Sequence, residues 1–437
     1  MSSSALPAVP PSVLPSVPPP APSSSPHGAL SAARILERIE ALARLSEQPD
    51  GLTRVYLSAE HARANALVGD WMREAGLAVR VDAVGNLIGR REGERPGLPC
   101  LMLGSHLDSV RNAGRYDGML GVITAIECVQ ALGAQALPFA IEVIGFADEE
   151  GVRFQATMLG SRAVAGTFDP QLLDLADARG VSMRDALRAF GLDPEQVADA
   201  ARRRDEVLAY VEYHIEQGPV LEAERLPVGV VTAINGQQRF RIELEGMAGH
   251  SGTVPMALRR DALAAAAECV LAAEAAAHAV PDAVATVGQI SVAPGATNVI
   301  PGRAVLSLDV RSPRDADRER VARTIVDACT AIGARRNVRV SATQTHVLDS
   351  CACAPWLRQQ LAQAITADGH RVRELPSGAG HDAMALVGLT DVAMLFLRCA
   401  KGISHHPAEA IEAEDAATGA RVLLNFIQRF RPQGGAH

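Results

Sequence analysis

Apolar residues recur along the chain with two different periods. Spacings of three or four residues, as between Ile35, Ile39 and Leu42, predict amphipathic helices, whereas uninterrupted apolar runs such as 139–146 predict buried strands. Helices are expected at about 29–45, 58–76, 119–132, 355–368 and 413–430, with a polar helical region at 160–208, and strands at about 78–82, 86–90, 101–106, 139–146, 209–216 and 391–397. Because strands and helices alternate, we expect an α/β fold with a mainly parallel sheet and helices on both faces.

A second, smaller domain is expected from about Asn235. Residues 239–245 alternate polar and apolar side chains, as a half-exposed antiparallel strand does. The elements expected after it are a helix at about 257–278, strands at 285–292 and 303–310, a helix at 314–332 and a strand at 337–345. This order predicts an α+β sandwich at 235–346. It would be inserted into a larger domain built from 29–234 and 347–432.

The first residues have a different composition from the rest of the chain. Residues 1–28 are dominated by Pro, Ser and Ala and contain no Lys or Arg. They therefore lack the basic start of a signal peptide and the arginines of a mitochondrial transit peptide, and we expect a disordered tail.

Bulk composition narrows the class of protein. The chain has 437 residues, of which 48% are hydrophobic, so two domains with sizeable cores are possible. A net charge of -8 argues against a nucleic-acid partner, and no apolar run approaches the roughly 18 residues that a membrane helix needs. The seven cysteines are scattered without CxxC spacing, which favours a reduced, cytoplasmic setting. Lys401 is the single lysine in the sequence, so catalysis by a lysine side chain is disfavoured.

The end of the predicted strand 101–106 carries the first candidate for chemistry. His106 and Asp108 close this strand, and a loop rich in Gly and Asn leads on to Asp117. Ligands bind at strand ends in open α/β sheets, so His106 and Asp117 are candidate metal ligands. Asp108, two residues after His106, points to the same side and is expected to fix the tautomer of the imidazole. A surface turn with a satisfied histidine is the alternative.

Two further strand ends strengthen the metal interpretation. The strand at 139–146 runs into Asp148, Glu149 and Glu150, and adjacent carboxylates repel one another unless a cation or solvent compensates. On the strand that begins near 209, His214 and Glu216 would share one side if the strand continues that far. Spacing alone leaves open whether His214 is a ligand or a structural histidine.

Nine motifs, in this order between about 30 and 430, resemble those of the M20-type metal-dependent amidohydrolases, specifically the allantoate amidohydrolase and N-carbamoyl-L-amino-acid hydrolase (hydantoinase/carbamoylase) group. They are GSHLDS, AGRYDGMLG, FADEEGVRF, HIEQGPVLE, GMAGHSGTVPM, GATNVIPG, LDVRS, GAGHDA and GISHHPAE. Any one of them would be a weak signal, but their shared order is a strong one.

The resemblance implies a site for two divalent metal ions. The expected ligands are His106, Asp117 as the bridge, Glu150, His214 and His405. Of the adjacent histidines His405 and His406, alignment of the last motif favours His405. This mixed nitrogen and oxygen set suits Mn²⁺ or Zn²⁺, with Co²⁺ or Ni²⁺ possible, better than Ca²⁺ or Mg²⁺. Glu149 would be the catalytic base that takes a proton from water and passes it to the leaving nitrogen.

The same resemblance implies substrate contacts and a dimer. His250 would stabilise the negative charge that forms on the carbonyl oxygen, and the neighbouring subunit of a homodimer would supply it. Arg311 offers the planar cation that a carboxylate substrate needs. Other substrate contacts are expected at Gln217, Asn298 and His381.

Two loops, 111–118 and 146–161, look most like those of allantoate amidohydrolases. The function expected from them is hydrolysis of allantoate to ureidoglycine, ammonia and carbon dioxide, in purine catabolism. An N-carbamoyl-L-amino-acid hydrolase, or a 3-ureidopropionase-like enzyme, is the alternative. A metallopeptidase and a catalytically inactive binding protein are less favoured. The expected partner is a small ureido acid, with no nucleic acid and no membrane.

Overall fold

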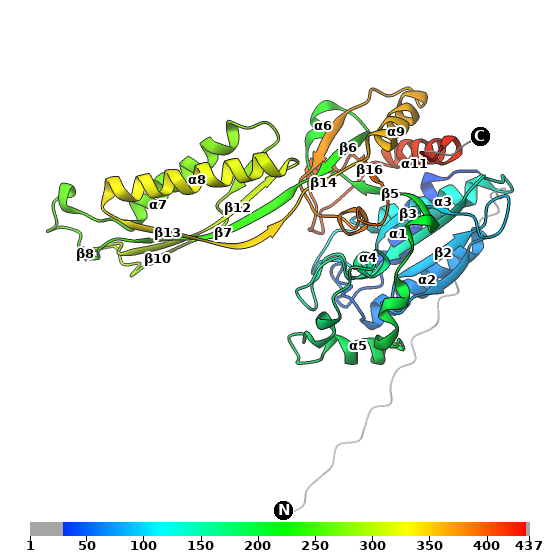
Figure 1. Ribbon diagram of the computed structural model, residues 1–437, viewed down its shortest axis with the longest axis horizontal. Helices are drawn as coiled ribbons and strands as arrows, with labels where there is room; N and C mark the ends of the chain where they lie inside the picture. The colour runs from blue at the N-terminus through cyan, green and yellow to red at the C-terminus, as the bar shows by residue number, and fades with distance from the viewer. Residues whose placement is uncertain (1–28, 434–437) are drawn as a thin grey trace, which may run out of the picture.

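The computed structural model describes residues 29–433, which form two domains joined side by side (Figure 1). The expected disordered tail, 1–28, lies outside the described residues. Each domain has its own hydrophobic core, and the core of the smaller domain draws only on residues between Phe240 and Val340. Separate cores are what two domains of this size require.

Nine strands of the described residues form the sheet of the larger domain. They are β1 (Ala78–Val81), β2 (Leu87–Arg91), β3 (Cys100–His106), β4 (Ala140–Phe146), β5 (Val207–Ile215), β6 (Val228–Ile234), β14 (Cys351–Ala352), β15 (Glu374–Ser377) and β16 (Val392–Leu397). Their order is β1-β2-β4-β3-β5-β16-β6-β14, with β15 beside β6. The central strands β4, β3, β5 and β16 run parallel, whereas β1, β2 and β14 pair antiparallel. The mainly parallel sheet is therefore confirmed.

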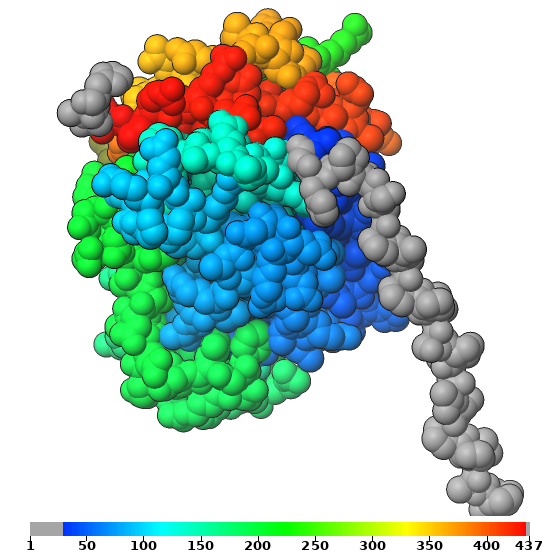
Figure 2. Space-filling view, turned by 90° about the vertical axis from the view of Figure 1, so that its right-hand side faces the viewer, coloured from blue at the N-terminus to red at the C-terminus, as the bar shows by residue number. Residues whose placement is uncertain are grey.

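Helices cover this sheet and draw on both ends of the chain. They are α1 (Ala32–Ala43), α2 (Ala59–Glu74), α3 (Met119–Leu132), α4 (Leu159–Val164), α5 (Met183–Phe190), α6 (Val220–Glu224), α9 (Pro355–Ala367), α10 (Ala383–Leu386) and α11 (Ala413–Arg429). Almost every residue of α3 is buried, because α3 lies between the sheet and the pair α1 and α11. In the space-filling view α11, in red, runs beside α9, in orange, above the blue and cyan N-terminal half (Figure 2). Within residues 29–433 no helix combines the length and the apolar character needed to cross a bilayer.

Two parts of the larger domain differ from the prediction. The region 160–208 is broken into the short helices α4 and α5 and three 3₁₀ turns, because Pro170 and Pro194 each start a new turn. Strand β6 was not predicted from the sequence. It follows α6 directly and pairs antiparallel with β16, so it breaks the alternation of strand and helix.

The smaller domain has the predicted order of elements. Its antiparallel sheet contains β7 (Gly236–Glu245), β9 (Val284–Thr286), β10 (Ile290–Ala293), β12 (Arg303–Ser312) and β13 (Arg339–Leu348), and its helices are α7 (Ala262–His278) and α8 (Asp315–Arg336). The strand predicted at 285–292 is split into β9 and β10. A two-stranded sheet of β8 (Gly249–His250) and β11 (Val299–Ile300) adds to it, and β8 lies at the end farthest from the larger domain (Figure 1).

The chain crosses between the domains on two neighbouring strands. Strand β7 leaves the larger domain and β13 returns to it, and the two pair from Gln237 opposite Leu348 to Glu245 opposite Arg339. Helix α8 braces this junction: buried Arg318 donates from Nη1 to the Leu348 carbonyl at 2.6 Å, and Asp315 accepts from the Ser350 amide at 2.9 Å. The return crossing, at Leu348 and Ser350, is thus held by the start of α8.

We expect Gly104→Ala to destabilise the larger domain strongly. A β-carbon at Gly104 would lie 1.9 Å from the carbonyl oxygen of Ile144 on the neighbouring strand, and its φ of +148° adds strain. The free energy of unfolding should fall by about 3 kcal/mol or more, the upper end of the usual cost of overpacking. Thermal or urea denaturation measures this. Gly388→Ala is the control, since nothing lies within 4 Å of its added β-carbon, and an equal effect of both changes would contradict the expectation.

Candidate metal centre

The candidate ligands gather at the carboxyl ends of adjacent parallel strands. His106 is the last residue of β3, His214 lies near the end of β5, and the acidic turn that holds Glu150 follows β4. Because β4, β3 and β5 are neighbours and run parallel, their ends meet at one edge of the sheet. Asp117 precedes α3, and His405 lies in the loop after β16.

Asp117 is the centre of the cluster. Its Oδ1 lies 3.0 Å from His214 Nε2 and 3.5 Å from His106 Nε2, and its Oδ2 lies 3.0 Å from His405 Nε2. Glu150 Oε1 lies 3.5 Å from the same His405 nitrogen. Donor atoms of these residues fall within 4.8 Å of one another in overlapping groups of three. The structure therefore brings all five predicted ligands together.

Backbone carbonyls fix which ring nitrogens face Asp117. His106 Nδ1 lies 3.1 Å from the Asp108 carbonyl oxygen, and His214 Nδ1 lies 2.9 Å from the Ile215 carbonyl oxygen. A carbonyl can only accept, so each Nδ1 carries a hydrogen, and the Nε2 atoms of the neutral rings turn their lone pairs toward Asp117. Lone pairs facing a carboxylate need a positive charge between them, which is what a bound metal ion supplies.

The raised pKa values of the metal-free cluster also show that it favours bound positive charge. Burial alone would lower the pKa of His106, but Asp117 and Asp108 raise it well above its usual value. The hydrogen bond to Asp117 raises the pKa of His405 to about 9. Burial, followed by the charge of Asp117, raises the pKa of Glu150 to about 7. These residues fit a divalent metal, because protons occupy the nitrogen and oxygen atoms that a cation would bind.

Asp108 supports the cluster in a different way from the one predicted. Its backbone carbonyl, not its carboxylate, accepts from the His106 ring, and its Oδ1 is 3.6 Å from His106 Nδ1. The carboxylate instead accepts from the backbone amides of Glu149 at 3.1 Å and Glu150 at 3.2 Å. Asp108 thereby links the strand end that carries His106 to the acidic turn after β4.

Glu149 faces the open part of the site. It lines a cavity of about 600 Å³ together with His106, Asp117 and His405, and a carboxylate oxygen of Glu149 lies within 4.8 Å of donor atoms of His106 and Glu150. Burial raises the pKa of Glu149 well above the usual value of a glutamic acid. A carboxylate with raised proton affinity beside a cavity is suited to accept a proton and give it back.

Two predicted substrate contacts, Gln217 and Arg311, line this cavity, and a third does not. Gln217 donates from Nε2 to Asp117 Oδ2 at 2.9 Å, and Arg311 reaches in from β12 of the smaller domain. His381 is buried with its ring centre 4.6 Å from that of His214 and a ring nitrogen 2.8 Å from Ser377 Oγ. In this structure His381 therefore supports a ligand from behind and does not line the cavity.

His250 and Asn298 lie together, but away from the cluster. His250 on β8 pairs with Val299, the residue after Asn298, and the Ser251 amide donates to the Asn298 carbonyl at 3.0 Å. Both side chains are exposed at the end of the smaller domain that points away from the metal centre (Figure 1). Within one chain, the structure does not bring them to the other site residues.

Glu409 was not predicted from the sequence, and Glu216 does not share the side of His214, because β5 ends at Ile215. Glu409 accepts from the amides of Tyr116 at 2.7 Å and Asp117 at 3.2 Å, and from Ser404 Oγ at 2.9 Å, so it holds the central carboxylate in position. The last motif, GISHHPAE, contains Glu409 and was its only signal. Glu216, expected beside His214, instead accepts from the first amides of α6.

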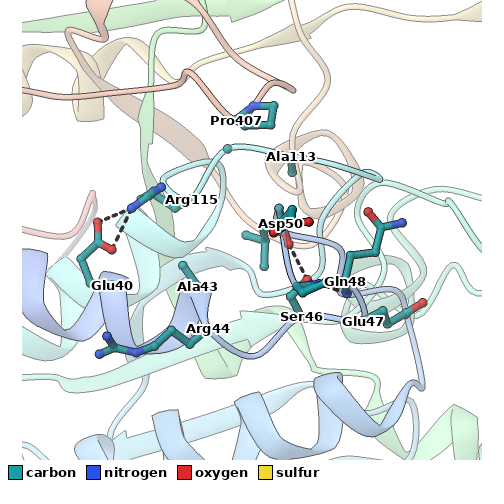
Figure 3. A pocket seen from close by; sticks show the side chains of 14 residues that line it. Glu40, Ala43, Arg44, Ser46, Glu47, Gln48, Asp50, Ala113, Arg115 and Pro407 are labelled. Atoms are coloured by element: carbon teal, nitrogen blue, oxygen red, sulfur yellow. Dashed lines mark hydrogen bonds and ion pairs between the residues drawn. The ribbon is translucent and has the colours of Figure 1, made fainter.

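The loop before Asp117 is anchored on its outer side. A surface pocket separate from the metal centre lies there, and Arg115 donates to both oxygens of Glu40 on α1 at 2.6 and 2.7 Å (Figure 3). On the same pocket wall Ser46 Oγ donates to the Gly51 carbonyl at 2.6 Å. The pair with Glu40 thus ties the loop before Asp117 to α1.

Comparison with known proteins places the chain in a family. The model of peptidase family M20/M25/M40 matches residues 102–429. The N-carbamoyl-L-amino acid amidohydrolase of Geobacillus stearothermophilus is 42% identical over 401 residues, covering 91% of this chain and 98% of that protein. The allantoate deiminase of Arabidopsis thaliana is 37% identical over 435 residues, covering 92% and 83%.

The fold has a close counterpart among solved structures. An amidase of the hydantoinase/carbamoylase family from Burkholderia multivorans superimposes with a TM-score of 0.86 at 33% identity, covering 91% of this chain and 97% of that one. The match includes both domains, because it spans nearly the whole of each chain. The chain therefore belongs to peptidase family M20/M25/M40, and within it to the metal-dependent amidohydrolases of the hydantoinase/carbamoylase type.

Proposed function

We propose that this enzyme hydrolyses the ureido C–N bond of a small substrate that also carries a carboxylate. The observation that carries the proposal is the cluster around Asp117, which shares one cavity with Glu149 and Arg311. A metal centre, a proton acceptor and a fixed guanidinium are the three groups that such a substrate needs. Relatives named for carbamoyl amino acids and for allantoate support the same class.

Two substrates within this class have support of different kinds. Identity favours an N-carbamoyl-L-amino acid, since three amidohydrolases of that name are 40–42% identical to this chain, against 37–38% for the allantoate deiminases. The loops 111–118 and 146–161, which resemble those of allantoate amidohydrolases, favour allantoate. A cytoplasmic location stays a prediction for either substrate.

The metal ions would be held by the five clustered residues, of which Asp117 is the central one. Mn²⁺ or Zn²⁺ suits the nitrogen and oxygen donors best, with Co²⁺ or Ni²⁺ as alternatives. When bound, the pair of ions supplies Lewis-acid activation of water and of the substrate carbonyl. Asp108 would hold His106 and the acidic turn in register, and Glu409 would keep the Asp117 carboxylate turned inward.

The remaining residues would handle the proton and the substrate. Glu149 would accept the proton of the attacking water and deliver it to the leaving nitrogen. Arg311 and Gln217 would hold the substrate carboxylate and ureido group. Asn298 and His250 would reach the site from a second subunit, since in one chain they lie at the far end of the smaller domain. This arrangement would make the homodimer the active unit.

A panel of substrates tests the proposed function. Metal-loaded enzyme should turn over allantoate, N-carbamoyl-L-amino acids, or both, and release ammonia from them. Dipeptides should be hydrolysed at least about a hundredfold more slowly, because a site built to bind ureido groups leaves polar atoms unpaired with other ligands. Comparison of kcat/KM across the panel decides between the two substrates. Faster release of amino acids from dipeptides would overturn the proposal.

Glu149→Gln should remove turnover without removing metal. The amide keeps the shape of the side chain but cannot take a proton, so kcat should fall by roughly 10²–10⁴-fold. Metal content, measured by elemental analysis after dialysis, should match the wild type. The neighbouring change Glu150→Gln is the matched control and should lower metal content. Metal loss in Glu149→Gln, or wild-type turnover, would contradict the role of Glu149.

Metal binding should release protons at neutral pH. In the metal-free protein His405, with a pKa of about 9, is protonated at pH 7, and Glu150, with a pKa of about 7, is partly so. A cation needs both groups deprotonated, so its affinity should rise between pH 6 and pH 8. Calorimetric titration of metal-free enzyme with Mn²⁺ in buffers of different ionisation enthalpy should show release of about one proton or more. The His405→Asn variant should release fewer protons when it binds Mn²⁺. Binding without proton release would show that these groups are not ligands.

A further inference from the structure

Two arginines of the smaller domain face one carboxylate on the wall of the cleft. Asp309 on β12 accepts from Arg311 Nε at 3.0 Å and Nη2 at 3.1 Å, and from Arg239 Nε on β7 at 3.0 Å. Burial alone would raise the pKa of Asp309, but the two guanidinium groups lower it, so Asp309 is an anion. One negative charge is shared by two positive ones, which leaves a net positive charge on this wall.

The two guanidinium groups differ in how many hydrogen-bond donors they leave free for a ligand. Arg311 also donates from Nη1 to the Gly378 carbonyl at 2.8 Å, so each of its nitrogens has a protein acceptor and only one hydrogen on each terminal nitrogen remains for the substrate carboxylate. Arg239 uses only Nε among the described residues, and its side chain is 50% exposed. Its two terminal nitrogens can therefore take both oxygens of a carboxylate.

Arg239 lines two neighbouring cavities. Arg239 and Arg311 both line the cavity of the metal centre, and both line a second cavity of about 680 Å³ along the outer face of the smaller sheet. In the pairing of β12 with β7, Arg239 lies opposite Asp309 and Arg311 opposite Gln237. The two arginines are thus diagonal neighbours, about 7–8 Å apart at their backbones. Arg239 therefore lies within reach of a substrate group that extends from Arg311 along this face of the sheet.

We propose that Arg239 is a second anion-binding position, and that the enzyme accepts N-carbamoyl amino acids with an acidic side chain, such as N-carbamoyl-L-aspartate and N-carbamoyl-L-glutamate. This inference rests on the proposed function, in which Arg311 binds the carboxylate next to the ureido nitrogen. The second carboxylate binds the free edge of Arg239. His346, the cross-strand neighbour of Arg239 on β13, lines the same cavity and offers a further donor.

Substitution of Arg239 tests this position. Arg239→Gln should lower kcat/KM for N-carbamoyl-L-glutamate about ten- to hundredfold more than for N-carbamoyl-L-alanine, the usual worth of a charged hydrogen bond, and mainly through KM. Arg303→Gln is the matched control. Arg303 lies on the same face of the same sheet, is 49% exposed and pairs with Glu243, but lines neither cavity. Arg303→Gln should leave kcat/KM for both substrates unchanged. Arg239→Lys should keep part of the kcat/KM for N-carbamoyl-L-glutamate that Arg239→Gln loses.

A binding measurement separates this inference from the proposed function. Metal-loaded wild-type enzyme should bind glutarate about tenfold or more tightly than butyrate in calorimetry, and Arg239→Gln should remove the difference. If no ureido acid is turned over, the proposed function fails, and the glutarate titration still decides on Arg239. Equal losses for acidic and neutral substrates, or equal affinities for glutarate and butyrate in the wild type, would overturn the second position.

Discussion

The carboxylate of Asp117, facing three imidazole nitrogens in a buried site, is the constraint on which the larger domain depends. Four ionisable groups this close are stable only if positive charge lies among them, as protons or as metal ions. The parallel strands β3 and β5 bring His106 and His214 to one edge of the sheet, and the loop after β16 adds His405. The order of the strands in the sheet thus places these side chains at one edge.

Support for the cluster comes mainly from backbone groups. Carbonyl oxygens orient the two imidazoles, and backbone amides hold the carboxylates of Asp108 and Glu409. Contacts of this kind fix the direction of a side chain without adding charge to the site. The ligands can therefore keep their geometry while their own charge state changes with the occupant of the site.

The sequence predicted those features that depend on local pattern. A buried strand that ends in His106, and a second that ends in an acidic turn, are visible as apolar runs followed by polar residues. The pairing of these ends follows from the parallel sheet. Glu216 and Glu409 could not be assigned in this way, because both are glutamates near a motif histidine, and only contacts with distant amides show that one caps a helix and the other supports Asp117.

The placement of His250 could not be obtained from pattern either, because it depends on how far the smaller domain extends. At the junction β7 and β13 cross side by side, and Arg318 and Asp315 of α8 hold the return crossing at Leu348 and Ser350. The two crossings lie side by side at one end of the smaller domain, and β8 with His250 lies at the other. A rotation of a few degrees at the junction would therefore displace His250 much more than residues close to Gly236.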